Sequence, residues 1–133
     1  MIDRNFLIGE WHGSFLGNSH DVLSLFASDF GFSRVVEINR TIHDEFKWSF
    51  SHSDQEITLH PLKEWTENGF LSHGKFKIEA TRTADQLNGV IEVLILSFAH
   101  EALDFEESGL KLHYPSGVAT AKFFRKQNDS GGS

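Results

Sequence analysis

The sequence predicts an all-β protein, a single antiparallel up-and-down barrel of about eight or nine strands. Strand-like runs recur at intervals of roughly 10–14 residues, which is the spacing of all-β domains. Apolar and polar residues alternate within several runs, as they do in a strand with one buried face. Aromatic residues make up 13% of the 133 residues, and 13 of them are phenylalanines, which are bulky enough to fill a wide interior. A sandwich of two such sheets is the alternative arrangement.

The alternation is clearest in three runs. Phe46, Trp48 and Phe50 share one face of their strand, and Phe76 and Ile78 share one face of another. The run at 110–114 alternates in the same way. In chain order the predicted strands are 8–16, 21–26, 32–38, 45–52, 56–62, 74–82, 90–99, 110–114 and 118–126.

Two segments allow a second interpretation. Residues 20–31 also carry apolar residues at helical spacing, so a short helix near the N-terminus is an alternative to a strand there. Residues 100–108 read as a helical turn or a loop. No linker or internal repeat divides the chain, so we expect one domain over residues 1–126 and a disordered tail over 127–133, which is rich in serine and glycine.

The formal net charge is −7, whereas nucleic acids and anionic membranes bind basic surfaces. We therefore expect no nucleic-acid or membrane partner. The chain has no cysteine, which excludes disulfides and thiolate metal sites. The first residues lack the basic and apolar regions of a signal peptide, and the longest apolar run is too short to span a bilayer. These features predict a cytoplasmic protein, with a mature secreted chain as the alternative.

Gly9 and Trp11 near the start and Arg125 in the last predicted strand resemble the G-x-W motif and the closing basic residue of the calycin superfamily. This group contains lipocalins, fatty-acid-binding proteins and avidins. Residues 23–33 also resemble the F-x-x-D-G-x-G hairpin of small bacterial lipocalin-like domains, except that Asp29-Phe30-Gly31 replaces Asp-Gly. The resemblance implies a lipocalin-like barrel in which the basic residue packs over the indole and closes one end. It implies no particular ligand.

The residues themselves support such a closure. In a closed barrel the first and last strands are neighbours, so an inward Trp11 meets Arg125. Gly9 and Gly13 lie two residues on either side of Trp11, on the same face, and leave room for the indole. An ordinary core tryptophan on any β-sheet is the alternative. If this end is closed, a ligand should be sought at the opposite mouth.

The predicted strand at 90–99 is apolar on both faces apart from Glu92. A strand of this kind needs a cover on its outer face, and a homodimer through this strand is one way to provide it. Two interpretations of Glu92 stay open. The side chain points inward, where it is paired or anchors a ligand, or it points outward at the rim of a dimer.

No catalytic or metal-binding motif is present. The chain has eight histidines, but no two have ligand spacing on one element, and no nucleophile elbow or phosphate loop occurs. We therefore expect no cofactor and lean against an enzyme.

Three functional hypotheses follow. The first is a barrel that binds a small hydrophobic or amphipathic molecule. The second is an acidic protein-interaction module, of the inhibitor or immunity type, with a packed core. The third is a haem-binding or enzymatic barrel. A void of about 300 Å³ or more favours a ligand, and a filled interior favours an interaction role. The predicted ligand lining is Phe46, Trp48, Phe50, Phe76, Ile78, Glu92, Leu94 and Leu96.

Overall fold

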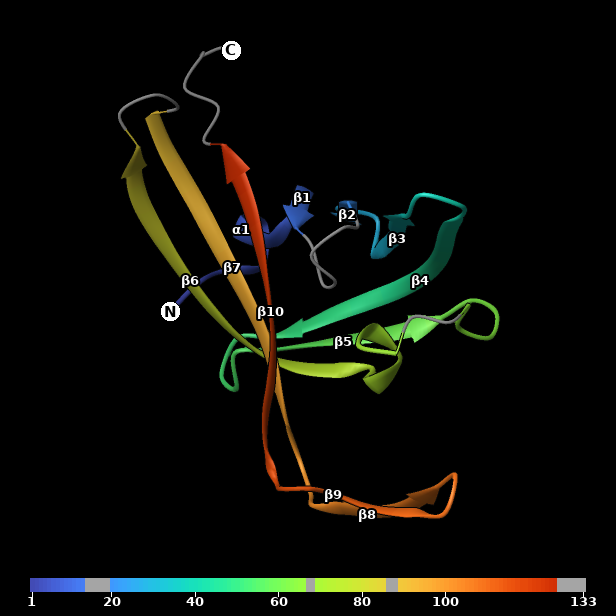
Figure 1. Ribbon diagram of the computed structural model, residues 1–133. Coiled ribbons are helices and arrows are strands. Elements are labelled where there is room, and N and C mark those ends of the chain that lie inside the picture. Colours follow the sequence, from blue (N-terminus) through green and yellow to red (C-terminus); the bar gives the residue numbers. More distant parts are fainter. Residues whose placement is uncertain (14–19, 67–68, 86–88, 127–133) are drawn as a thin grey trace.

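A computed structural model describes residues 1–13, 20–66, 69–85 and 89–126 (Figure 1). Eight antiparallel strands close into a barrel in the order β1-β10-β7-β6-β5-β4-β3-β2, and β8 and β9 form a separate two-stranded sheet. The predicted fold class is therefore confirmed, with the barrel rather than the sandwich. The strands are β1 (Gly9–Gly13), β2 (His20–Leu25), β3 (Phe30–Val36), β4 (Thr41–Ser51), β5 (Glu56–Pro61), β6 (Lys75–Asp85), β7 (Gly89–His100), β8 (Leu103–Glu107), β9 (Leu110–Tyr114) and β10 (Gly117–Lys126).

Two short helices accompany the strands. α1 (Arg4–Leu7) precedes β1, and the 3₁₀ turn η1 (Leu71–His73) precedes β6. No helix in the described part of the chain is long and apolar enough to cross a membrane. The predicted tail at 127–133 lies outside the described residues.

The structure decides the two segments that the sequence left open. Residues His20–Leu25 form strand β2, so the helical alternative there is wrong. All but the first residue of β2 are buried, so both faces of this strand are covered. Residues Leu103–Glu107 form strand β8 rather than a helical turn or a loop. The run at Leu110–Tyr114 is a strand as predicted, but it pairs only with β8 and is not part of the barrel.

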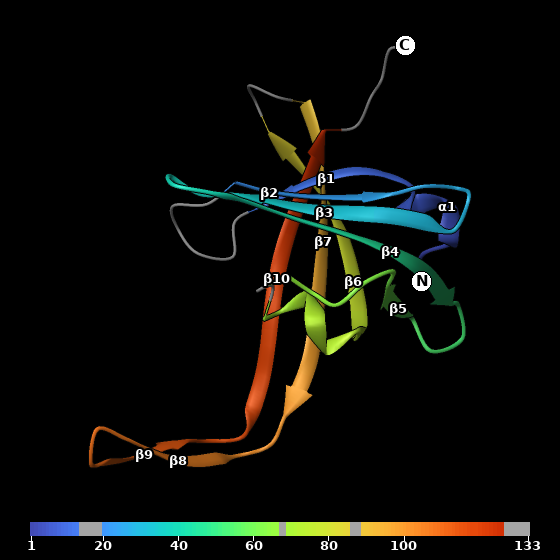
Figure 2. The same ribbon diagram turned by 90° about the vertical axis from the view of Figure 1, so that its right-hand side faces the viewer.

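The barrel is up-and-down, and this fixes which connections share an end. Consecutive strands from β1 to β7 pair with each other, and β10 closes the ring between β7 and β1. Alternate connections therefore lie at the same end. The N-terminal segment before β1 shares one end with the β2–β3 and β4–β5 turns, and we call this the N-terminal end. The β8–β9 hairpin, inserted between β7 and β10, leaves from the opposite end (Figures 1 and 2).

The interior is a single cluster of side chains that project inward from the barrel strands. Trp11, Phe46, Phe76 and Phe123 are each at most 1% exposed. Leu7 of α1 belongs to the same cluster, so the N-terminal segment is part of the core. The close contact of β2, β3 and β4 depends on Gly31, where a Cβ atom would lie 2.4 Å from the carbonyl oxygen of Ser24.

Candidate functional site

Arg125 and Trp11 meet at the N-terminal end of the barrel, as the sequence predicts. The guanidinium carbon of Arg125 lies 3.9 Å from the centroid of the Trp11 ring, and the indole is fully buried. The indole Nε1 donates a hydrogen bond to the carbonyl oxygen of Leu7 at 3.0 Å. A cation over an indole face adds about 0.5–2 kcal/mol, depending on its exposure to water. The last strand is thus linked to the first strand and to α1.

The two glycines beside Trp11 leave space for different neighbours. At Gly9 a Cβ atom would lie 2.9 Å from Nη1 of Arg125, and the backbone has a φ of +132°, which other residues rarely adopt. At Gly13 a Cβ atom would lie 2.5 Å from the carbonyl oxygen of Lys122, a backbone atom of β10. Gly9 therefore admits the arginine, and Gly13 admits the neighbouring strand, so the expectation that these glycines leave room for the indole itself is wrong.

Glu92 points into the barrel and stands between two arginines on the neighbouring strands. Arg82, Glu92 and Arg125 are direct partners in the register of β6, β7 and β10. Glu92 Oε1 accepts from Arg125 Nε at 3.1 Å, and Oε2 accepts from Arg82 Nε at 3.4 Å. Burying the Glu92 carboxylate is costly in free energy, and the two guanidinium groups offset that cost. Of the two interpretations of Glu92, the structure supports the inward one, and we call these three residues the charged row.

The two arginines of the charged row differ in their exposure to solvent and in their hydrogen-bond partners. The Arg125 side chain is 20% exposed and donates to the carbonyl oxygens of Ile8 and Phe6, each at 2.8 Å. The Arg82 side chain is 61% exposed, and Glu92 is its hydrogen-bond partner among the described residues. Arg125 is therefore a structural residue, whereas Arg82 presents its outer guanidinium nitrogens to solvent.

The N-terminal segment crosses this end of the barrel and is held at several points. The backbone N–H of Ile2 donates a hydrogen bond to the side-chain Oε1 of Gln55, in the β4–β5 turn. Nε2 of the same side chain donates to the carbonyl oxygen of Ile2. Arg4 forms an ion pair with Asp29, and its guanidinium carbon lies 4.3 Å from the centroid of the Trp48 ring. These contacts fix the segment as a wall rather than a loose tail.

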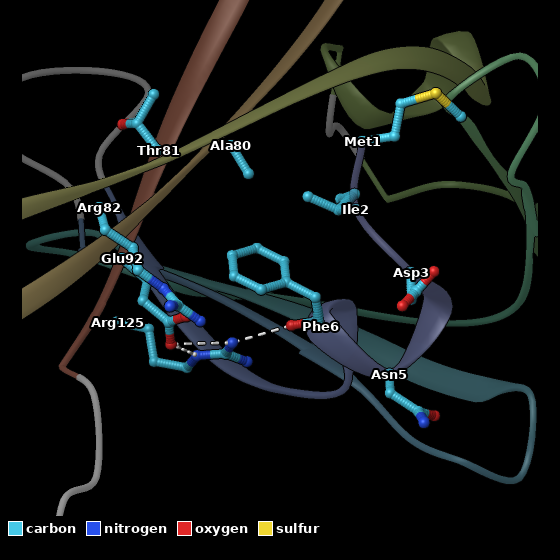
Figure 3. Close-up of a pocket in the computed structure, with 10 residues that line it drawn as sticks. All are labelled: Met1, Ile2, Asp3, Asn5, Phe6, Ala80, Thr81, Arg82, Glu92 and Arg125. Carbon is cyan, nitrogen blue, oxygen red and sulfur yellow. Dashed lines mark hydrogen bonds and ion pairs between the residues drawn. The ribbon is translucent and has the colours of Figure 1, made fainter.

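A pocket of about 750 Å³ lies between this segment and the inner face of β6, β7 and β10 (Figure 3). The N-terminal residues form one wall, and the charged row lies on the other. The apolar part includes Ile2, Phe6 and Ala80, and the Phe6 ring is 5.2 Å from the Arg125 guanidinium carbon. We call this the N-terminal pocket. Its lining residues are Met1, Ile2, Asp3, Asn5, Phe6, Ala80, Thr81, Arg82, Glu92 and Arg125.

Most of the predicted ligand lining lies elsewhere. Glu92 alone of those eight residues borders the N-terminal pocket. Phe50 packs against the core cluster while remaining partly exposed. The other predicted residues are 6% exposed or less and pack in the core cluster: Phe46, Trp48, Phe76, Ile78, Leu94 and Leu96. They fill the interior instead of surrounding a void.

Sequence reasoning missed most of the N-terminal pocket. Arg82 could have been predicted from the sequence, because it alternates in step with Phe76 and Ile78 and so lies on the inner face of the strand. The N-terminal wall gave no signal, because residues 1–6 have no strand pattern. The pocket also lies at the end closed by Trp11, not at the opposite mouth.

A smaller pocket of about 440 Å³ lies at that opposite end, between the start of β4 and residues 62–66. Its lining is mostly charged and includes His43, Glu45, Lys63 and Glu64. Asp44 is buried there, and its Oδ1 accepts from the backbone N–H of Thr66 at 2.8 Å. This carboxylate ties the β5–β6 connection to β4.

The histidines are spread over the barrel and the β8–β9 hairpin, with one close pair on the barrel. His12 Nδ1 and His20 Nε2 are 3.2 Å apart on the adjacent strands β1 and β2, and both residues lie near solvent. Within the described ranges, no group of three or more histidine, aspartate or glutamate side chains could hold a metal ion.

Comparison with protein-family models, with characterised proteins and with solved structures finds no match to this chain.

Proposed function

We propose that this protein is a non-catalytic, lipocalin-like barrel that binds a small amphipathic anion in the N-terminal pocket. The observation that carries the proposal is the asymmetry of that pocket. One part is apolar, with Ile2, Phe6 and Ala80, and the other part presents Arg82. A volume of about 750 Å³ falls within the range of roughly 300–1,000 Å³ that is typical of small-molecule sites.

Arg82 is the group best placed to receive the anionic head of the ligand. Glu92 holds its Nε, and this contact orients the guanidinium while the terminal nitrogens remain exposed. An arginine fixed in this way binds a carboxylate or sulfonate with little further loss of side-chain entropy. The apolar part of the ligand would lie against Phe6 and Ile2. The ligand would thus bind at the end of the barrel rather than within its filled interior.

Binding can be tested by fluorescence titration with 1-anilinonaphthalene-8-sulfonate, followed by displacement with decanoate. We expect saturable binding to one site. Arg82→Gln should weaken binding of both anions by about tenfold or more, because a charge-assisted hydrogen bond is worth roughly 1.5–3 kcal/mol. The matched control is Lys77→Gln, which removes one charge from the outer face of the same strand and should leave the affinity within about twofold.

Decanol distinguishes the contribution of the apolar part of the pocket from that of Arg82, because it has the same alkyl chain as decanoate without the charge. The natural protein should bind decanol more weakly than decanoate. The affinity for decanol should be the same in the natural protein and in Arg82→Gln. Phe6→Ala should weaken both ligands. Absence of saturable binding, or equal decanoate affinity in the natural protein and Arg82→Gln, would overturn the proposal.

A further inference from the structure

The β8–β9 hairpin has one apolar face and one charged face. Opposite residues of an antiparallel pair project to the same side, and the pairs Leu103–Tyr114 and Phe105–Leu112 are apolar, while the third pair on that side, Glu107–Leu110, places one carboxylate next to the turn. The rings of Phe105 and Tyr114 stack with their centroids 5.4 Å apart. On the other side, Asp104 forms an ion pair with His113. We call this element the hairpin arm.

The apolar face of the hairpin arm is uncovered in the monomer. Leu103, Leu110 and Tyr114 are 58%, 65% and 56% exposed. The arm forms its own sheet and lies beyond the end of the barrel, joined to it through β7 and β10 (Figures 1 and 2). An isolated two-stranded hairpin is at best marginally stable in water. Its apolar side chains therefore need a surface to pack against.

A second uncovered apolar surface lies on the outside of β7 and β10. Glu92, Leu94 and Leu96 point inward, so the alternate residues of β7 point outward and are only partly buried. On β10, Val118 is 64% exposed and Phe124 is 45% exposed. We call this surface the outer face, and it consists of Ile91, Val93, Ile95, Val118 and Phe124.

The charges beside the two surfaces are opposite in sign. Glu101, Asp104, Glu106 and Glu107 on and next to the hairpin arm outnumber Lys111. Around the outer face, the described outward positions of β6 and β10 carry Lys75, Lys77 and Lys122 and one acid, Glu79. Lys77 forms an ion pair with Glu56 of β5, and Glu10 of β1 lies next to the β10 edge of this face, so the border has only a small basic excess. An acidic apolar arm and a basic-bordered apolar face are complementary.

One chain cannot bring its own two surfaces together in this structure. Only residues 101–102 and 115–116 separate the arm from β7 and β10, and the arm turns sharply from these strands and runs beyond the end of the barrel instead of folding back along them (Figures 1 and 2). A second copy can supply both surfaces at once, since under two-fold symmetry each arm meets the outer face of the other copy. We propose that the protein forms a homodimer in which the two hairpin arms are exchanged in this way.

Sedimentation velocity over a concentration series tests the association. We expect a reversible dimer for the natural protein. Leu110→Ser combined with Tyr114→Ser on the arm, and separately Ile95→Asp on the outer face, should each raise the dimer dissociation constant by about tenfold or more. The matched control is Lys111→Ser, on the charged face of the arm, which should leave a dimer. A circular dichroism melt of each variant checks that the barrel is folded.

Cross-linking tests the arrangement of the two copies, because the chain has no cysteine of its own. Leu110→Cys places a thiol on the arm, and Phe124→Cys places one on the outer face. Mixed and treated with a flexible bis-maleimide, the two variants should cross-link to each other in preference to themselves. A monomer at every concentration would overturn the proposal. Preferential cross-linking of Leu110→Cys to itself, or of Phe124→Cys to itself, would also overturn it.

Discussion

The two ends of strands β7 and β10 make an instructive comparison. Near the N-terminal end, Glu92 and Arg125 are inside the barrel, and their polar atoms are bonded to each other, to Arg82 and to the carbonyl oxygens of the N-terminal segment. At the other end the same two strands continue into the hairpin arm, whose apolar side chains contact water. One end is completed by the chain itself, and the other presents an apolar surface without a cover.

The difference shows that closure depends on what the chain places at each end. At the N-terminal end, α1 supplies Leu7 to the core and the carbonyl oxygen of Phe6 to Arg125, and Ile8 just after the helix supplies a second carbonyl oxygen. Mutations there should reduce the stability of the barrel, whereas mutations in the hairpin arm should leave it nearly unchanged. Three substitutions test this contrast.

The largest effect is expected for Trp11→Ala. The indole is fully buried, and its loss removes the contact with Arg125 and the hydrogen bond to Leu7. The free energy of unfolding should fall by roughly 3–5 kcal/mol, as for other buried tryptophans. Urea denaturation measures this change. Phe124→Ala is the control, because that ring is 45% exposed and its loss should cost far less. Equal costs for the two variants would contradict the closure.

A smaller loss is expected for Gly9→Ala. The backbone at Gly9 has a φ of +132°, and the new methyl group would lie 2.9 Å from Arg125. Strain of this kind costs about 1–3 kcal/mol. The matched control is Gly69→Ala, where a Cβ atom meets nothing within 4 Å. Thermal unfolding should separate the two variants, and a Gly9→Ala midpoint as high as that of Gly69→Ala would show that the position tolerates a side chain.

The smallest effect on the barrel is expected for Leu110→Ser in the hairpin arm. This side chain is 65% exposed, so its loss should change the unfolding free energy of the dilute monomer by about 0.5 kcal/mol or less. Chemical denaturation at a protein concentration well below the dimer dissociation constant measures this change. A loss comparable to that of Gly9→Ala would mean that the arm packs on its own barrel, and the contrast between the two ends would disappear.

The candidate site could be predicted only in part. The G-x-W motif and the adjacency of the first and last strands in a closed barrel predicted that an inward Trp11 meets Arg125, and this contact is present. Strand parity applied to Phe46, Trp48 and Phe76 correctly predicts inward side chains, but it does not reveal whether those side chains enclose a void or fill it. That outcome depends on the volumes of all the strands together.

The sequence by itself determined the all-β fold and the inner and outer faces of most strands. These features repeat every two residues or depend on a few local residues, so they can be read along one chain. The tertiary structure alone decided three others. It brought Arg82 and Arg125 to either side of Glu92, it placed the segment 1–8 across the end of the barrel, and it set Leu110–Tyr114 outside. Each depends on pairings between distant segments, and a local pattern carries no information about the register of such pairings.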